Sequence, residues 1–307
     1  MKRVLAVTAL MLLLTGCGSS SSSDQTKNGS IALSGQPSLS GAQGIFLRDP
    51  NGSLSRLTTV TNGRDVFPSW SHDGKRIAYL RMSDDLEDGT ARLLVMNADG
   101  TDAHQVRDVV ATAGQIAWSP DDDLLVFTAA PAGVWTVKAD GSEPKRQIFA
   151  ENAADPSWSV DGRIVISRLI GHGLTSMNAD GGDVRVLTHP KRQPKAVLPD
   201  LHSHPAWSPD GKRIAFIWRV WLRTKDLLYP TTIEIVNADG TGQRTLTKIF
   251  DESSTTLSWS PDGRFIAFTD LRGVPGLWKI PSGGGPATAL IGNSSSYSMP
   301  SWGPAGA

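Results

Sequence analysis

The chain has 307 residues, and its 30 lysines and arginines balance 30 aspartates and glutamates. A formal net charge of zero provides no general attraction to phosphate backbones, so we expect no nucleic-acid partner. One cysteine excludes an internal disulfide framework and a cysteine-rich zinc site. The 31 glycines and 19 prolines are typical of a chain built from many short strands and turns.

The first 16 residues resemble a bacterial lipoprotein signal peptide. Lys2 and Arg3 precede an apolar run, Val4 to Leu14, that is too short to span a bilayer as a helix. The run ends in Leu-Thr-Gly-Cys17, which resembles the lipobox, and the resemblance implies cleavage before Cys17 and attachment of diacylglycerol to its thiol. An ordinary secretory signal with a chance cysteine is the alternative.

A serine run and other polar residues follow the cysteine, so residues 17–29 are expected to be a lipidated, flexible tether. We expect the protein to lie outside the cytoplasm, with the lipid anchored in the cell membrane or an outer membrane. The remaining residues, 30–307, are expected to form the folded domain.

A repeated motif, Trp-Ser-x-Asp-Gly followed by a basic residue and an apolar strand, organises this domain. It recurs at a mean spacing of about 46 residues, which falls in the range of propeller repeats. The copies begin at Trp70, Trp118, Trp158, Trp207 and Trp259, with a degenerate copy at Trp302. The second copy reads Trp118-Ser-Pro-Asp-Asp.

A second motif, an Asp-Gly turn after a short apolar run, lies between the copies of the first, as in Met96-Asn-Ala-Asp-Gly100. Ser-Pro-Asp-Gly and Asp-Gly are both tight turns, because proline presets φ and glycine tolerates the left-handed region. Each repeat therefore predicts four antiparallel strands, the blade of a β-propeller. The repeated tryptophans are expected to fill the space between blades.

The two ends of the domain together supply one further blade. Ile31–Leu33, Gly44–Leu47 and Ser55–Thr58 correspond to strands two to four of a blade, and Tyr297–Trp302 corresponds to its first strand. The predicted fold is an all-β, six-bladed propeller closed by pairing of the C-terminal strand with the N-terminal blade.

These repeats resemble the TolB-like six-bladed propellers, a group with WD40-like repeats, over about residues 30 to 307. The resemblance implies a monomeric scaffold that binds a protein or peptide of the cell envelope. The group also includes propellers attached to prolyl-oligopeptidase-like peptidases, and oligogalacturonate lyases. TolB itself carries a separate N-terminal α/β domain, whereas this chain has only the tether and the lipobox there.

Function is expected on the rim that carries the long connections and at the adjoining mouth of the central channel, because variable loops on a rigid scaffold usually bind ligands. Counting back from each tryptophan gives the polar residues that should approach this mouth. They are Asp65, Gln115, Asp155, His202 and His204.

His202 and His204 are the one pair that could carry chemistry. On a regular strand, residues i and i+2 face the same side, so the two imidazoles could share a divalent metal. The lyase resemblance implies histidines and a glutamine around manganese, with Gln115 or Asp155 completing the set. A metal-dependent carbohydrate-active enzyme is therefore the alternative function. Two polar histidines at the channel rim are the simpler explanation of the pair, because a functional metal also needs third and fourth ligands.

No Gly-x-Ser-x-Gly elbow and no phosphate-binding loop occurs in the sequence, so we favour a binding module without a cofactor over an enzyme. Lys191, Arg192 and Lys195 form a basic cluster in a proline-rich connection, which is either a solvated loop or a contact for an acidic partner. Trp218 and Trp221 either pack over the rim or belong to a recognition surface.

Overall fold

The computed structural model describes residues 28–36, 43–83, 90–112, 114–129, 133–143, 145–150, 152–168, 173–190, 200–220, 231–249, 256–270, 276–292 and 297–307. The predictions for Cys17, Lys191, Arg192, Lys195 and Trp221 fall outside these residues. Within the described residues, no helix is long and apolar enough to cross a membrane.

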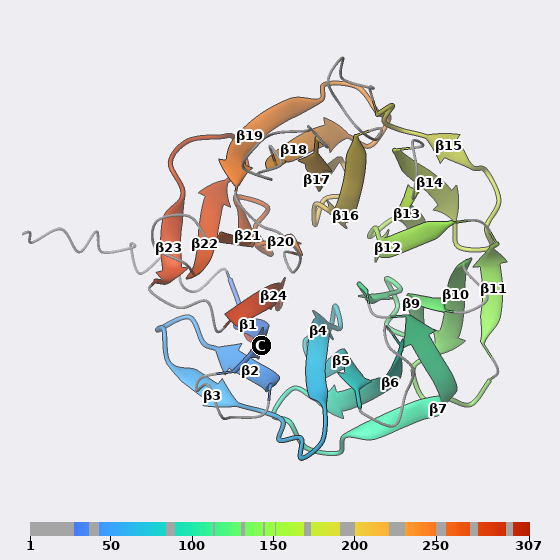
Figure 1. Ribbon diagram of the computed structural model, residues 1–307, viewed down its shortest axis with the longest axis vertical. Coiled ribbons are helices and arrows are strands. Elements are labelled where there is room, and N and C mark those ends of the chain that lie inside the picture. The colour runs from blue at the N-terminus through green and yellow to red at the C-terminus, as the bar shows by residue number, and fades with distance from the viewer. Residues whose placement is uncertain are drawn as a thin grey trace, which may run out of the picture.

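The described strands form six four-stranded antiparallel sheets, arranged radially as the blades of a propeller (Figure 1). This confirms the predicted all-β propeller. In each blade the inner strand is the one that ends at the repeated tryptophan. The first three blades, from the inner strand outward, are β24 (Tyr297–Trp302), β1 (Ile31–Gly35), β2 (Gly44–Arg48) and β3 (Leu54–Arg56); β4 (Arg64–Trp70), β5 (Arg76–Met82), β6 (Thr90–Asn97) and β7 (His104–Thr112); and β8 (Ala117–Trp118), β9 (Leu124–Ala129), β10 (Gly133–Lys138) and β11 (Arg146–Phe149).

The other three blades repeat this arrangement. They are β12 (Ala153–Trp158), β13 (Arg163–Arg168), β14 (Leu174–Asn178) and β15 (Arg185–Val186); β16 (Leu201–Trp207), β17 (Arg213–Arg219), β18 (Thr231–Asn237) and β19 (Arg244–Ile249); and β20 (Ser258–Trp259), β21 (Phe265–Asp270), β22 (Gly276–Pro281) and β23 (Thr288–Ile291).

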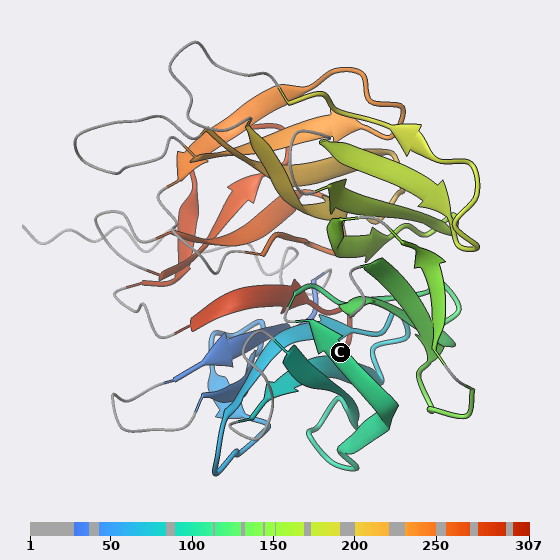
Figure 2. The ribbon, with the colours of Figure 1, turned by 45° about the vertical axis from the view of Figure 1, so that its right-hand side comes forward.

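The ring closes where the two ends of the chain meet. Strand β24 pairs with β1, from Ile31 opposite Trp302 to Gly35 opposite Tyr297, and Figure 2 shows β24 beside the N-terminal blade. Backbone hydrogen bonds extend this pairing beyond the ends of the strands. Ser30 N–H donates to the Ala307 carbonyl at 3.2 Å, and Gly303 N–H donates to the Ser30 carbonyl at 2.8 Å. The expected closure is therefore present.

The Ser-x-Asp-Gly turn holds its shape through the serine and aspartate side chains. In the first copy, Ser71 Oγ donates to Asp73 Oδ1 at 2.7 Å and accepts the Arg76 N–H at 2.9 Å. Gly74 has a φ of 69°, where a side chain would be strained. The same serine–aspartate contact recurs in the other complete copies, at Ser119, Ser159, Ser208 and Ser260. These turns form one rim of the ring, called the turn rim below.

The repeated tryptophans pack between neighbouring blades, as expected. Trp118 is 1% exposed and belongs to an apolar cluster that draws on both its own blade and the preceding one. Its Nε1–H donates to the Ser69 carbonyl at 2.9 Å, and the Arg76 guanidinium lies 4.6 Å from its ring centroid. An indole of this size removes a large apolar area from water at the interface between two blades, and this burial holds the blades together.

Four inner strands contain a β-bulge that the repeat pattern did not predict. The residue three before the tryptophan has a positive φ there and precedes a proline, while the pairing with the next strand shifts by one residue. These residues are Phe67, Asp155, His204 and Met299, with φ of 53°, 51°, 50° and 53°. The two remaining blades have Ile116 and Leu257 in place of the proline, and their inner strands β8 and β20 are only two residues long.

Candidate functional site

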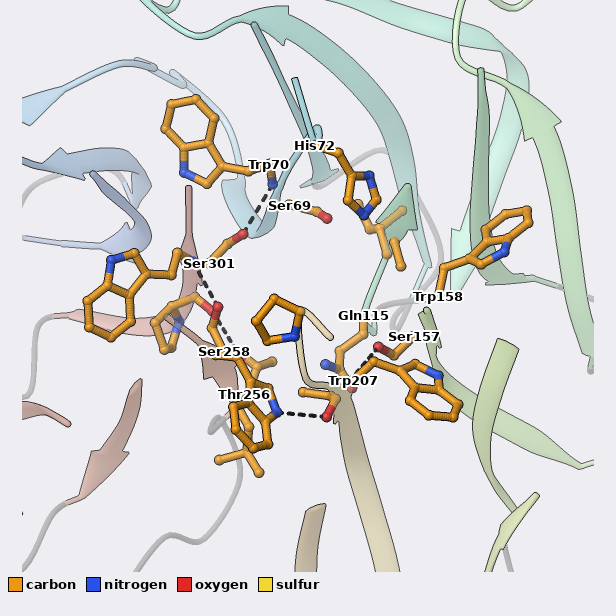
Figure 3. Close-up of a pocket in the computed structure, with 18 of the residues that line it drawn as sticks. Ser69, Trp70, His72, Gln115, Ser157, Trp158, Trp207, Thr256, Ser258 and Ser301 are labelled. Carbon is orange, nitrogen blue, oxygen red and sulfur yellow. Dashed lines mark hydrogen bonds between the residues drawn. The ribbon is translucent and has the colours of Figure 1, made fainter. Parts of the chain in front are cut away.

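A cavity of about 390 Å³ lies in the centre of the ring, within the half of the channel that adjoins the turn rim (Figure 3). Its wall consists of the last residues of the inner strands and the first residues of the turns. The wall includes Trp70, Trp158, Trp207, Trp259 and Trp302, together with Pro68, Pro156, Pro209, Pro261, Pro300 and Pro304. Among the described residues of the wall, His72 is the only one with a titratable side chain, so the cavity is almost neutral.

Serine hydroxyls in the wall connect successive blades (Figure 3). Trp70 N–H donates to Ser301 Oγ at 3.1 Å, and Trp302 N–H donates to Ser258 Oγ at 2.8 Å. The backbone N–H of an inner strand that faces the channel lacks a partner strand, so a hydroxyl from the preceding blade satisfies it. These serines are therefore structural acceptors.

Asp122 joins two neighbouring turns at the rim of the cavity. Its Oδ1 accepts the His72 N–H at 2.7 Å and its Oδ2 accepts the Asp73 N–H at 2.8 Å, while His72 Nδ1 lies 3.0 Å from Oδ1. Asp122 has a φ of 58°, in the left-handed region that glycine occupies in the other copies. The irregular Trp-Ser-Pro-Asp-Asp copy was the sequence signal for this contact, but sequence reasoning gave it no role.

Asp65 is fully buried and its charge is matched inside its own blade. The Arg81 guanidinium binds it with two hydrogen bonds, Nε to Oδ1 at 2.7 Å and Nη2 to Oδ2 at 2.9 Å. These bonds raise the pKa of Arg81 above its ordinary value. Burial, aided by the Asp65 charge, raises the pKa of nearby Tyr79 to about 12. Asp65 therefore sits in a closed ion pair, and its predicted role in binding stays a prediction.

Asp155 is also buried, at 8% exposure, but its surroundings differ. Its Oδ2 accepts hydrogen bonds from Ser167 Oγ at 3.1 Å and from the His204 N–H at 3.2 Å. Its Oδ1 lies 3.8 Å from Nε2 of His204 in the adjacent blade. The structure thus brings Asp155 and His204 together across the interface between β12 and β16.

Gln115 occupies the equivalent position in the blade on the other side of Asp155, and Figure 3 shows its side chain directed into the channel. Its Oε1 is buried and has no hydrogen-bond partner among the described residues. The preceding residue, Gly114, adjoins Asp155: a Cβ there would lie 3.7 Å from Asp155 Oδ1. Gly114 therefore lies against Asp155, and the predicted role of Gln115 in binding stays a prediction.

His202 has different neighbours from His204. Its ring is 2% exposed, with Nδ1 2.7 Å from Thr188 Oγ1 and ring contacts to Phe216 and Trp218 at 5.1 and 5.9 Å between centroids. Burial, with a smaller repulsion from His189, lowers its pKa to about 4. The bulge that begins after Ser203 interrupts the alternation on which the expected shared metal depended.

The metal site expected at His202 and His204 stays a prediction. The described residues contain no group of three or more histidine, cysteine, aspartate or glutamate side chains that could hold a metal ion. Trp218, the described member of the expected aromatic pair, donates from Nε1 to Asp200 Oδ2 at 3.0 Å and packs on His202. Its role in recognition stays a prediction.

No protein-family model matches the chain. A curated protein of unknown function from Agrobacterium fabrum, Atu1656, is 26% identical over 199 residues, which cover 58% of this chain and 62% of that protein. The uncharacterized peptidase YuxL of Bacillus subtilis is 26% identical over 159 residues, which cover 50% of this chain and 22% of the peptidase. The matched part thus spans less than two thirds of the length of either relative.

Solved structures share the fold at low sequence identity. TolB from Acinetobacter baumannii superposes with a TM-score of 0.71 at 18% identity, covering 90% of this chain and 67% of TolB. A protein from Agrobacterium tumefaciens assigned as TolB gives a TM-score of 0.60 at 19% identity, covering 87% of this chain and 89% of that one. An oligogalacturonate lyase in complex with manganese gives 0.56 at 16% identity, covering 87% of this chain and 74% of the lyase. The chain therefore has the six-bladed propeller fold of TolB-like proteins.

Proposed function

We propose that this protein is an extracytoplasmic, lipid-anchored propeller that binds a protein or peptide segment of the cell envelope. The observation that carries the proposal is the axial cavity of about 390 Å³, whose wall of tryptophan, proline and serine is almost neutral. Such a wall suits apolar and backbone contacts with a bound chain, and it offers few groups for acid–base chemistry. The lipobox at Cys17 supports the location, and the likeness to TolB supports a scaffold.

The point at which the chain enters the ring supports a defined orientation on the membrane. Asn28 and Asp262 exchange two hydrogen bonds at the turn between β20 and β21, at 3.1 and 3.3 Å. The chain therefore joins the ring at the turn rim. Cys17 precedes Asn28 by 11 residues, which reach at most about 40 Å when fully extended. In this proposal the turn rim faces the membrane, and the bound segment enters the channel from the opposite rim and reaches the cavity along the axis of the ring.

Lipid attachment is tested by replacing Cys17 with serine. We expect wild-type protein to incorporate labelled palmitate and to sediment with membranes, and the C17S protein to lose the label and leave the membrane fraction. A C17S protein that still sediments after a high-salt wash would contradict a lipid anchor.

The binding function is tested by cross-linking in intact envelopes followed by reconstitution from purified components. We expect one partner to be recovered in stoichiometric amount and to bind the purified propeller directly, with a change in tryptophan fluorescence from the cavity wall. Hydrolysis or elimination on a carbohydrate polymer, with manganese retained at one ion per chain and lost in both H202A and H204A, would instead establish the alternative enzyme.

A further inference from the structure

Within the described residues, the Asp155 carboxylate forms no ion pair with a lysine or arginine, and the one ionisable side chain near it is that of His204. Among the residues that the structure describes, its polar contacts are the Ser167 hydroxyl, the His204 N–H and the His204 ring. A buried carboxylate costs several kcal/mol unless a charge or strong hydrogen bonds compensate it, so Asp155 is under-compensated.

Two further buried polar atoms, one on each of the blades that flank the blade of Asp155, lack hydrogen-bond partners among the described residues. Gln115 Oε1 and His204 Nδ1 are buried and make no hydrogen bond to any described residue. With its proton on Nε2, which faces Asp155, the His204 ring presents Nδ1 as an acceptor. Gly114 lies close to Asp155 Oδ1, since a Cβ at this glycine would be in van der Waals contact with that oxygen, at 3.7 Å.

The three acceptors occupy equivalent positions in three successive blades. Gln115, Asp155 and His204 each stand three residues before the repeated tryptophan. The other three blades place Phe67, Thr256 and Met299 at that position, and Phe67 and Met299 pack with the apolar cluster around Trp118. The acceptors are therefore confined to one side of the channel.

We propose that Gln115, Asp155 and His204 bind the cationic end of a lysine or arginine side chain in the bound peptide. This inference rests on the proposed peptide-binding function and names the ligand class. An ammonium or guanidinium group brings positive charge and several donors but no acceptor, which complements one carboxylate and two neutral acceptors. A neutral side chain could donate a hydrogen bond but would bring no positive charge to Asp155, and an acidic side chain would repel it.

The first experiment uses small cations and does not depend on a peptide. Butylammonium and butylguanidinium are titrated into isotopically labelled protein while the His204 ring signals, assigned with H204Q, are followed by NMR. We expect saturable shifts with both cations, none with butanol, and at least tenfold weaker binding in D155N. The matched control is D180N, which alters an exposed carboxylate in a turn of another strand pair and should respond like the wild type.

Several results of this titration would overturn the cation site. They are equal shifts with butanol, no shift with either cation, or an unchanged response in D155N that unfolds at the wild-type temperature. Manganese that broadens the His204 signals and cannot be displaced by butylammonium would also overturn it, because the site would then be a metal site.

The second experiment separates the cation site from the proposed function. Twelve-residue peptides are selected from a random display library on the immobilised wild-type protein and measured against D155N and D180N. We expect a recurrent lysine or arginine, with at least tenfold weaker binding after its replacement by norleucine or in D155N. Peptides that bind D155N and the wild type equally would overturn the cation site and keep the peptide function. If the small cations bind but no peptide is selected, the cation site is kept and the peptide-binding function is overturned.

Discussion

The regions around Asp65 and Asp155 contain the same kind of group in opposite states. Both carboxylates lie on inner strands, and both are buried. Arg81 satisfies Asp65 with a two-pronged ion pair inside one blade, whereas Asp155 lies at an interface between blades and contacts only neutral donors and a histidine. A closed ion pair is expected to serve the fold, whereas the cation site proposed above uses the carboxylate that has no such pair among the described residues.

A third buried aspartate, Asp122, is compensated by backbone N–H groups and has, among the described residues, no arginine partner of the kind that Asp65 has. It is 7% exposed, and two backbone N–H groups of the neighbouring turn supply its hydrogen bonds. We therefore expect the loss of unfolding free energy on substitution to depend on the partners of each carboxylate more than on its burial.

The largest effect is expected from removing the partner of Asp65. R81M leaves a fully buried carboxylate without its cation, so the free energy of unfolding should fall by about 3–5 kcal/mol. Urea denaturation followed by tryptophan fluorescence measures this change. R185M, which breaks an exposed pair with Asp183, is the control and should cost less than about 1 kcal/mol. An equal loss of unfolding free energy in the two variants would show that the buried Asp65–Arg81 pair stabilises the fold no more than an exposed pair does.

The next largest effect concerns pH and His202, which lies near the Asp155 region on β16. Its pKa is lowered to about 4 in the folded protein, against 6.5 for the ordinary ring. Above pH 6.5 neither state is protonated, and between pH 6.5 and 4 only the unfolded chain gains the proton. Stability should therefore fall as the pH falls through this window, by about 3 kcal/mol in total from this group. The measurement is the difference in unfolding free energy between wild type and H202N at several pH values, and a constant difference would refute it.

A smaller loss is expected at the turn rim. D122G restores the glycine of the other repeats but removes the acceptors for the N–H groups of His72 and Asp73, and it should cost about 1–2 kcal/mol. D122N keeps one oxygen acceptor and should lose less. Thermal unfolding ranks the three proteins, and a D122G protein as stable as the wild type would show that the contact between turns contributes little.

The smallest effect on stability is expected at Asp155 itself. In D155N the amide oxygen can still accept from Ser167 or from the His204 N–H, while the cost of burying a charge disappears. The free energy of unfolding should change by less than about 1 kcal/mol, in the same urea assay. A loss as large as that of R81M would place Asp155 with Asp65 among the structural groups.

The architecture could be read from the sequence because each repeat carries its own turn chemistry. Trp-Ser-x-Asp-Gly and Asn-Ala-Asp-Gly mark both turns of a blade, and the unmatched strands at the two ends predict the closure that β24 and β1 make. Local signals of this kind need no knowledge of distant contacts.

The partners of the site residues could not be read in the same way. If the register of Trp70 opposite Ile77 continued unbroken, Asp65 would face Met82, but the bulge places it opposite Arg81. The same shift in β16 separates the surroundings of His202 and His204. Phe67-Pro68 and its equivalents were visible in the sequence, yet the effect of the bulge on each side chain depends on contacts with the next blade.

The joined ends also determine how the ring would carry mechanical load. A pull on the chain before Asn28 acts along β1, which is flanked by β24 on one side and β2 on the other. Because hydrogen bonds between antiparallel strands lie perpendicular to the strands, a force along β1 shears many of them together and cannot peel them one by one. Tension between the proposed tether and a partner proposed for the far rim would therefore load the bonds of β1 in shear, the direction in which they resist best.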